Sequence, residues 1–492
     1  MLPPSGERGP VVAAAAGQDQ RQGRRPAGYG TILRAGADAA VGGNAGDARA
    51  ACALSRFPSW CDDVKAFLQR LFNVRRDEVV PVLVAALFFF CVLTALMLLR
   101  PARDALGMQR GIESVRWLFI GTALATLLVN PVFSWLVARC RRLQFIGATY
   151  AFFALGLVGF WWLLVFAPDA VGEPSGQVFY VWFSVFNLFA TMVFWALMAD
   201  RFSLEQSRRF FALIAVGGTL GAIFGPWLAQ RLAQPLGTPA LLLVSAGFLL
   251  LAIVAAWGVA HGQAGKASEG RTQAQEVIGG SAWQGLKATF QSRYLCGIAG
   301  YVVIMTIMAA FLYFTRLAMV ADLGDDTDLR TTMFARIDFY TQVATLLLQA
   351  VLAGHLMKRL GVALTLALLP LTIALGFVGL AMAGTLAVLI LFEAAFRAVQ
   401  RAITRPARET LYTVVSREDK YKSKAFIDTF VYRGGDVIGA QVDGVLARLG
   451  LGLGALASIA LPLALAWGLL GLWLGREQQR KASSAASIKP AD

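Results

Sequence analysis

Charged side chains set beside long apolar runs are the groups in this sequence that could do chemistry. The segment LRPARDALG carries Arg100, Arg103 and Asp104 directly after an apolar run that begins near residue 79. Guanidinium groups bind phosphate and carboxylate groups through paired, charge-assisted hydrogen bonds. We therefore predict that Arg103, with Asp104 beside it, contacts a negatively charged substrate.

A second group of charges recurs with helical spacing nearer the C-terminus. With an advance of 100° per residue, Glu393, Arg397 and Arg408 fall on one helical face, with Arg401 close by. An isolated charge at the bilayer centre costs at least ~2.5–3.5 kcal/mol, so this face lines a wet cavity or pairs internally. We predict that the arginines bind anions and that Glu393 neutralises Arg397. The alternative is an intrahelical pair, with the outer arginines reaching to the membrane surface.

The following segment has a face of acidic and small residues. Asp428, Asp436 and Asp443 share this face, and Arg433 stands at its edge. These carboxylates either pair with the arginines of the preceding segment or couple transport to a counter-ion, and the sequence leaves both readings open. Asp338, on the polar face of another predicted helix, is a further candidate for charge pairing or coupling.

Composition indicates the elements that must position these charges. The 492 residues are 57% hydrophobic and only 15% charged, with a mean hydropathy of +0.60. Apolar runs of 18 or more residues are long enough to cross a hydrocarbon core of about 30 Å as helices. The predicted fold class is an all-α polytopic membrane protein in two six-helix halves. Its twelve predicted spans are residues 79–99, 117–138, 145–167, 178–199, 210–230, 240–260, 294–315, 334–356, 361–381, 385–405, 425–447 and 452–474.

The predicted spans group into two sets of six, separated by a long polar stretch that starts at His261. Two halves of this kind are typical of secondary transporters. The predicted organisation is a disordered cytoplasmic tail over 1–76, six-helix bundles over 77–260 and 294–475, a cytoplasmic linker over 261–293 and a cytoplasmic tail over 476–492.

Loop charges indicate the orientation. Arg139, Arg141 and Arg142 follow the second predicted span, whereas the loop at 322–328 is acidic. Because loops rich in Lys and Arg face the cytoplasm, we predict cytoplasmic termini and a bacterial inner membrane location. The net charge of +15 is attributed to these loops and not to nucleic-acid binding. The arginines between 100 and 116 then lie outside, where we expect their field to collect anions; the alternative is surface arginines paired with nearby acids.

A row of small residues marks one predicted helix. Gly217, Gly221 and Gly225 recur every four residues, and Pro226 follows. Such spacing lets two membrane helices approach closely, so we predict a helix-packing face. The same pattern resembles the GxxxGP signature of exchangers in the major facilitator superfamily.

Three motifs resemble the ATP/ADP translocase family of nucleotide transporters, whose fold is of the major facilitator type. They are LRPARDALG, the segment FWALMADRFSLEQSRRFFALIAVGG, and REDKYKSKAFIDTFVYRGGD, which contains Lys424 and Asp428. The resemblance implies exchange of nucleotides or other phosphorylated anions, with Arg103 and Lys424 contacting the substrate. The chain departs from the family where it lacks acids, at 178–199 and 294–321. It therefore resembles a diverged bacterial branch.

We predict an exchanger of phosphorylated anions, with ATP and ADP as candidates, that works as a monomer in the lipid bilayer by alternating access. No P-loop, nucleophile elbow or metal-ligand pattern occurs, so we expect no enzymatic activity, cofactor or metal. One alternative is a proton-coupled exporter of small organic molecules that uses Asp338 or Asp436. A more distant alternative is a scaffold or sensor that transports nothing.

Overall fold

The structure, a computed structural model, describes residues 78–139, 142–261, 282–352, 356–450 and 452–487. These residues form helices and short connections, and none of them forms a strand. The predicted all-α fold class is thus confirmed. The predicted N-terminal tail, most of the predicted linker and the last part of the C-terminal tail lie outside the described residues.

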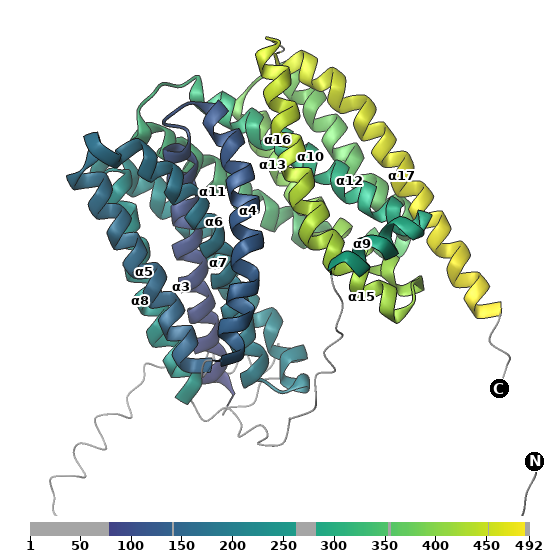
Figure 1. Cartoon of the computed structure of the whole chain (residues 1–492), viewed down its shortest axis with the longest axis horizontal. Coiled ribbons are helices and arrows are strands. Elements are labelled where there is room, and N and C mark those ends of the chain that lie inside the picture. The colour runs from purple at the N-terminus through teal and green to yellow at the C-terminus, as the bar shows by residue number, and fades with distance from the viewer. Residues whose placement is uncertain (1–77, 140–141, 262–281, 353–355, 451, 488–492) are drawn as a thin grey trace, which may run out of the picture. The chain divides into compact units, whose positions relative to one another are not determined.

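Six long helices come first along the chain (Figure 1). They are α3 (Val79–Gly107), α4 (Ile112–Arg139), α5 (Arg142–Phe166), α6 (Pro168–Arg201), α7 (Leu204–Leu236) and α8 (Thr238–His261). Their apolar side chains form one core, drawn mainly from α3, α5, α6, α7 and α8. Ser203 begins α7 with a capping box, in which its hydroxyl accepts from the Gln206 backbone amide while the Gln206 side chain accepts from the Ser203 amide.

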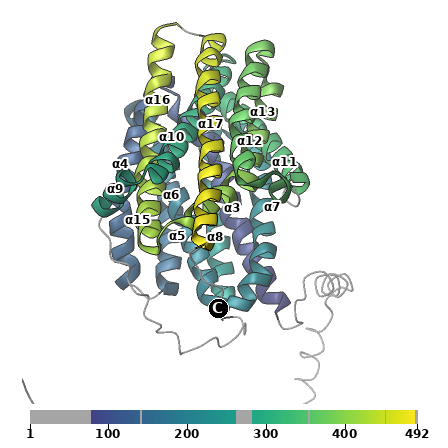
Figure 2. The ribbon, with the colours of Figure 1, turned by 90° about the vertical axis from the view of Figure 1, so that its right-hand side faces the viewer.

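The second set of helices is less regular (Figure 2). It contains α9 (Ala282–Gln291), α10 (Arg293–Ala321), α11 (Thr327–Leu352), α12 (Leu356–Ala383), α13 (Leu386–Val399), α14 (Arg405–Leu411), α15 (Arg417–Phe426), α16 (Tyr432–Arg448) and α17 (Leu453–Ser487). Two π-helical turns interrupt it: η1 (Gln400–Thr404) joins α13 to α14, and η3 (Ile427–Val431) joins α15 to α16. A 3₁₀ turn, η2 (Tyr412–Val414), follows α14.

The first predicted span ends later than the sequence indicated. We predicted its end at residue 99, but α3 continues through Pro101 to Gly107, and Asp104 is fully buried. Proline lacks an amide hydrogen, yet it is tolerated in membrane helices where neighbouring groups satisfy the freed backbone. Ala105, in the last turns of α3, packs into a second core with residues of α10 to α17, while Ala102 and Leu106 pack into the first core. The arginines of α3 are therefore part of a buried region and not of an external loop.

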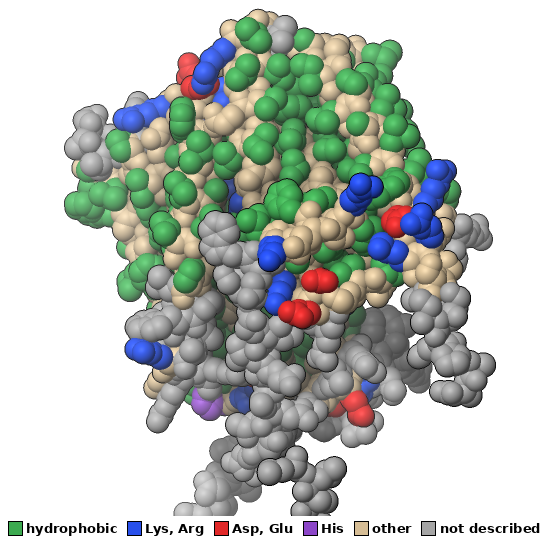
Figure 3. All heavy atoms as spheres, turned by 45° about the vertical axis from the view of Figure 1, so that its right-hand side comes forward, with side chains coloured by type: hydrophobic (Ala, Val, Ile, Leu, Met, Phe, Trp, Pro, Cys, Tyr) green, Lys and Arg blue, Asp and Glu red, His purple; other side chains and the backbone are tan. Residues whose placement is uncertain are grey.

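Nine helices in the described part of the chain are long and apolar enough to cross a membrane. The predicted spans that fall outside this set correspond to α11, α13 and α16, of which α13 and α16 are short, with 14 and 17 residues. Figure 3 shows hydrophobic side chains over much of one face, with charged side chains gathered below them and a few more at the upper left edge. This distribution fits a bilayer around the apolar band.

The glycine row of α7 lies against the backbone of α3. A Cβ atom on Gly217 would lie 2.2 Å from the carbonyl oxygen of Ala86, and one on Gly221 would lie 2.4 Å from that of Phe90. At Gly225 the nearest atoms, 2.8 Å away, are also backbone atoms of α3. Pro226 follows within the same helix. Because backbone atoms cannot rotate away, any side chain here would separate the two helices.

We predict that Gly221→Ala destabilises the protein by about 1–3 kcal/mol, as expected when atoms are forced into a packed interface. The measurement is the thermal unfolding midpoint of the purified protein in detergent. Gly247→Ala in α8 is the matched control, since a Cβ there meets nothing within 4 Å. An equal midpoint for both variants would contradict the close packing of α3 on α7.

Candidate functional site

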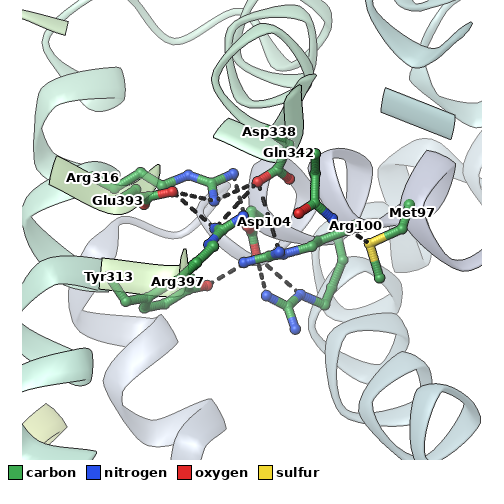
Figure 4. A network of polar contacts seen from close by, with 10 residues as sticks. Met97, Arg100, Asp104, Tyr313, Arg316, Asp338, Gln342, Glu393 and Arg397 are labelled. Atoms are coloured by element: carbon green, nitrogen blue, oxygen red, sulfur yellow. Dashed lines mark hydrogen bonds and ion pairs between the residues drawn. The ribbon is translucent and has the colours of Figure 1, made fainter. Parts of the chain in front are cut away.

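A buried network of charges lies where α3, α10, α11 and α13 meet (Figure 4). Helical spacing explains the positions of its members, because side chains three or four residues apart share a helical face. Its charged members are Arg100, Arg103 and Asp104 on α3, Arg316 on α10, Asp338 on α11, and Glu393 and Arg397 on α13. We call these seven residues the central cluster.

Arg316 is the hub of the central cluster. Its side chain is completely buried, and its Nη1 donates to Asp338 Oδ1 at 3.0 Å. Its Nη2 lies 3.5 Å from Asp104 Oδ2, and its Nη1 lies 3.9 Å from Glu393 Oε2. One guanidinium group thus contacts carboxylates from three helices, a geometry that suits its planar fork of donors.

Asp338 and Glu393 draw two further arginines into the cluster. Arg397 Nη2 donates to Glu393 Oε2 at 2.8 Å and lies 3.5 Å from Asp338 Oδ1. Arg100 Nη1 lies 3.7 Å from the same Asp338 oxygen. Asp338 therefore contacts three guanidinium groups, while Nη1 of Arg397 has no hydrogen-bond partner among the described residues.

Asp104 organises the other side of the cluster. Arg103 Nε donates to Asp104 Oδ1 at 2.9 Å, and the Tyr313 hydroxyl donates to the same oxygen at 2.9 Å. The Tyr180 and Tyr313 hydroxyl groups lie 3.0 Å apart. The Arg103 guanidinium lies 4.6 Å from the centre of the Tyr180 ring, within cation–π range. Arg103 is thus held between a carboxylate and an aromatic face.

The central cluster carries more positive than negative groups. Its four arginines outnumber its three carboxylates. Arginine stays charged in proteins, so protonation of a carboxylate would only enlarge the surplus. A buried charge without a partner is costly, and the surplus needs an anion or water beside it.

A cavity of about 470 Å³ lies beside the cluster. Arg100, Arg103, Glu393 and Arg397 line it, whereas Arg316 is shielded from it. The rest of its polar wall is supplied by Thr122, Tyr180, Ser184, Asn187, Tyr313, Arg401, Tyr432, Arg433 and Asp436. This central cavity therefore collects residues from both the first and the second set of helices.

The remaining predicted cations, Arg408 and Lys424, line a second cavity of about 490 Å³ together with Glu409 and Asp428. We call it the lower cavity. Arg408 Nη2 lies 3.1 Å from Asp428 Oδ1, and Lys424 pairs with Glu409. The two cavities adjoin, since Arg401, Tyr432 and Arg433 line both. Lys424 and Arg103, which the resemblance treats as two contacts of one substrate, thus belong to different cavities.

Asp443 forms a charge pair, but with a different partner from the one expected. We expected it to pair with arginines of the preceding segment or to face the transport pathway, but its Oδ2 accepts from Arg116 of α4 at 2.8 Å. Asp436 also pairs elsewhere, 3.6 Å from Arg433 of its own helix. The reason is that α16 packs directly on α4, a contact that helical periodicity cannot reveal.

Several contacts tie the two sets of helices at the end where Asp443 lies. Glu113 pairs with Arg448, and the Thr238 amide donates to Asp328 Oδ1 at 2.7 Å. The Thr238 hydroxyl also lies 2.8 Å from that of Thr331. The lower cavity lies on the other side of the central cavity from these contacts, toward the junction of α14 and α15.

Arg316 and Tyr180 were not among the predicted site residues, although Arg316 contacts all three carboxylates of the cluster. A usable signal existed, because a lone arginine within an apolar span needs a buried partner. His, Cys, Asp and Glu side chains form no group of three or more that could hold a metal ion within the described ranges.

An all-helical membrane protein with a charged cavity between two sets of helices has the architecture of a secondary transporter. The sequence model described as "Major Facilitator Superfamily" matches residues 79–404. The chain belongs to this superfamily, and it is a transporter and not an enzyme. No curated protein matches the sequence significantly. The narrower resemblance to ATP/ADP translocases stays a prediction.

Solved structures share the fold at low sequence identity. A mutant of the nucleoside transporter NupG is 13% identical with a TM-score of 0.56, covering 82% of this chain and 99% of that one. A bacterial homologue of the human lysosomal transporter Spinster, in an inward-facing and unoccupied conformation, is 10% identical with a TM-score of 0.54, covering 85% and 100%. A D-xylose–proton symporter is 13% identical with a TM-score of 0.53, covering 81% and 96%.

We predict that Asp338→Asn lowers the free energy of unfolding by about 3–5 kcal/mol, since removing one partner of a buried ion pair leaves uncompensated charge. The unfolding midpoint in detergent measures this loss. Asp322→Asn, at an exposed residue after α10, is the control and should leave the midpoint unchanged. Adding Arg316→Gln to Asp338→Asn should recover part of the loss, and a further drop would contradict charge compensation as its cause.

Proposed function

We propose that the chain is a secondary transporter of small anionic solutes, exchanging one phosphorylated anion for another by alternating access. The observation that carries this proposal is the surplus of buried arginine over carboxylate beside the central cavity. A negatively charged solute would supply the missing charge, and guanidinium groups favour phosphate and carboxylate oxygens.

ATP and ADP are candidate solutes because of the three sequence motifs, but other phosphorylated anions fit the cavity charge equally well. The nucleotide exchangers that the motifs resemble carry glutamates in their fourth and seventh spans. In the corresponding segments this chain has no acid; Asn187 and Tyr313 line the central cavity there, and Arg316 is buried beside it. These replacements remove negative charge from the site. With fewer carboxylates the site repels anions less. We therefore expect a small, strongly anionic solute and not one that carboxylates select.

Within this proposal, the protein works as a monomer in the bacterial inner membrane, with both termini in the cytoplasm. The tied end near Asp443 is then the external side, and the lower cavity opens to the cytoplasm. In alternating access only one side of the solute site is open at a time. Exchange therefore requires that the contacts near Asp443 break when the side of the lower cavity closes.

Proton-coupled export remains a second candidate because one carboxylate faces the central cavity with a single long contact. Asp436 lines the cavity and lies 3.6 Å from Arg433, whereas Asp338 is held by three arginines. Of the two residues suggested by the sequence, Asp436 is the better placed to carry a proton. Transport that collapses with an uncoupler but ignores competing phosphates would favour this mechanism.

The test is uptake of labelled ATP, ADP and orthophosphate by intact bacterial cells that express the chain. We expect saturable uptake of at least one of them, released by adding the unlabelled anion outside. Arg397→Gln should reduce uptake by about tenfold or more, because a hydrogen bond to a charged group contributes about 1.5–3 kcal/mol. Arg103→Ala should have a similar effect.

Arg480→Gln, at an exposed position of α17, makes the same charge change away from both cavities and should transport as the wild type does. Arg397→Lys keeps the charge and should retain part of the uptake. The amount of each variant in the membrane is measured alongside. Unchanged uptake in both Arg397→Gln and Arg103→Ala would reject the central cavity as the anion site.

A further inference from the structure

We propose that the lower cavity is a second oxyanion-binding subsite, separate from the central cavity. It would hold the anionic group of the solute on its way to or from the central cluster. The ligand chemistry is that of a phosphate or carboxylate group, and the inference rests on the proposed transport of anions. The residues that build it are Arg401, Thr404, Arg405 and Arg408, from η1 and α14.

The cations of the lower cavity differ in whether a carboxylate already holds them. Lys424 is paired with Glu409, and Arg408 is paired through Nη2 with Asp428. Arg401 and Arg405 are exposed to the cavity space, and no ion pair or hydrogen bond links either side chain to another described residue. Two guanidinium groups are thus available to an incoming anion.

Two residues of the cavity wall also carry a buried hydrogen-bonding group that has no partner among the described residues. The groups are the hydroxyl of Thr404, whose residue is only 1% exposed, and Nε of Arg408. Nε of arginine can only donate, and the hydroxyl can donate. Buried polar groups in proteins almost always have a partner, so unpartnered donors on residues of a cavity wall point to a ligand with acceptor oxygens. A bound oxyanion would supply such acceptors beside the two unpaired arginines.

The π-helical turn explains why these groups converge. Its wider turn, with i→i+5 hydrogen bonds, shifts the register of the helix that carries Arg397 above it and Arg405 below it. Arg401 stands within this turn and lines both cavities, so it can contact an anion in either place. The arrangement gives a solute a continuous series of cations between the two cavities.

Binding of labelled orthophosphate to the purified full-length protein in detergent, measured by equilibrium dialysis at fixed ionic strength, tests this subsite. We expect the wild type to bind two phosphates per chain. Arg405→Gln and Thr404→Val should each weaken one of them by about tenfold or more, since charge-assisted hydrogen bonds are lost. Arg397→Gln should instead weaken the other, and Arg480→Gln should bind as the wild type does.

The variants are chosen to fold, because Arg405 is unpaired and exposed, while Thr404→Val removes only an unpartnered hydroxyl. Two phosphate sites of unchanged affinity in both variants would overturn the subsite. A single site that is sensitive to Arg397→Gln but not to Arg405→Gln would also overturn it, while leaving the proposed anion transport intact. A site lost in Arg405→Gln, in a protein that moves no anion, would support the subsite and reject the proposed function. No phosphate binding by folded wild type would reject both.

Discussion

Compensation of buried charge is the constraint on which the rest of this structure depends. Seven charged side chains meet among apolar helices, and each carboxylate of the cluster contacts guanidinium groups from more than one helix. In lipid, the hydrophobic effect contributes little to the choice of helix partners, so polar contacts carry more of that choice. The pairing of Arg316 with Asp104, Asp338 and Glu393 therefore fixes how α3, α10, α11 and α13 meet.

Two parts of α3 meet their neighbours by different physical means. Its middle turns, from Ala86 to Leu98, lie against the glycines of α7 at distances that leave no room for a side chain. Its last turns carry Arg103 and Asp104, and Asp104 contacts Arg316 of α10. A rigid contact between backbones thus anchors the same helix that presents Arg100 and Arg103 to the central cavity. Positioning of the anion site is coupled to this packing.

The cavity-lining helices of the second set are less regular. Both α13 and α16 adjoin a π-helical turn, and residues of both turns line the lower cavity. Such turns occur frequently at functional sites because they change the register of side chains within one helix. Here the change brings Arg401 to the boundary of two cavities. Simple α-helical spacing had placed Arg401 only near the edge of the charged face.

The sequence by itself determined the features that depend on local order along the chain. These are the all-helical membrane fold, the spacing that pairs Glu393 with Arg397, and the glycine row of α7, because each follows from helical periodicity and side-chain size. It also pointed to Arg103 through the charge beside an apolar run. It did not reveal that α3 continues past Pro101, that Arg316 is the hub of the cluster, or that Asp443 pairs with Arg116. Those facts depend on which helices lie side by side, and only the tertiary structure decides which buried charges are close enough to neutralise one another.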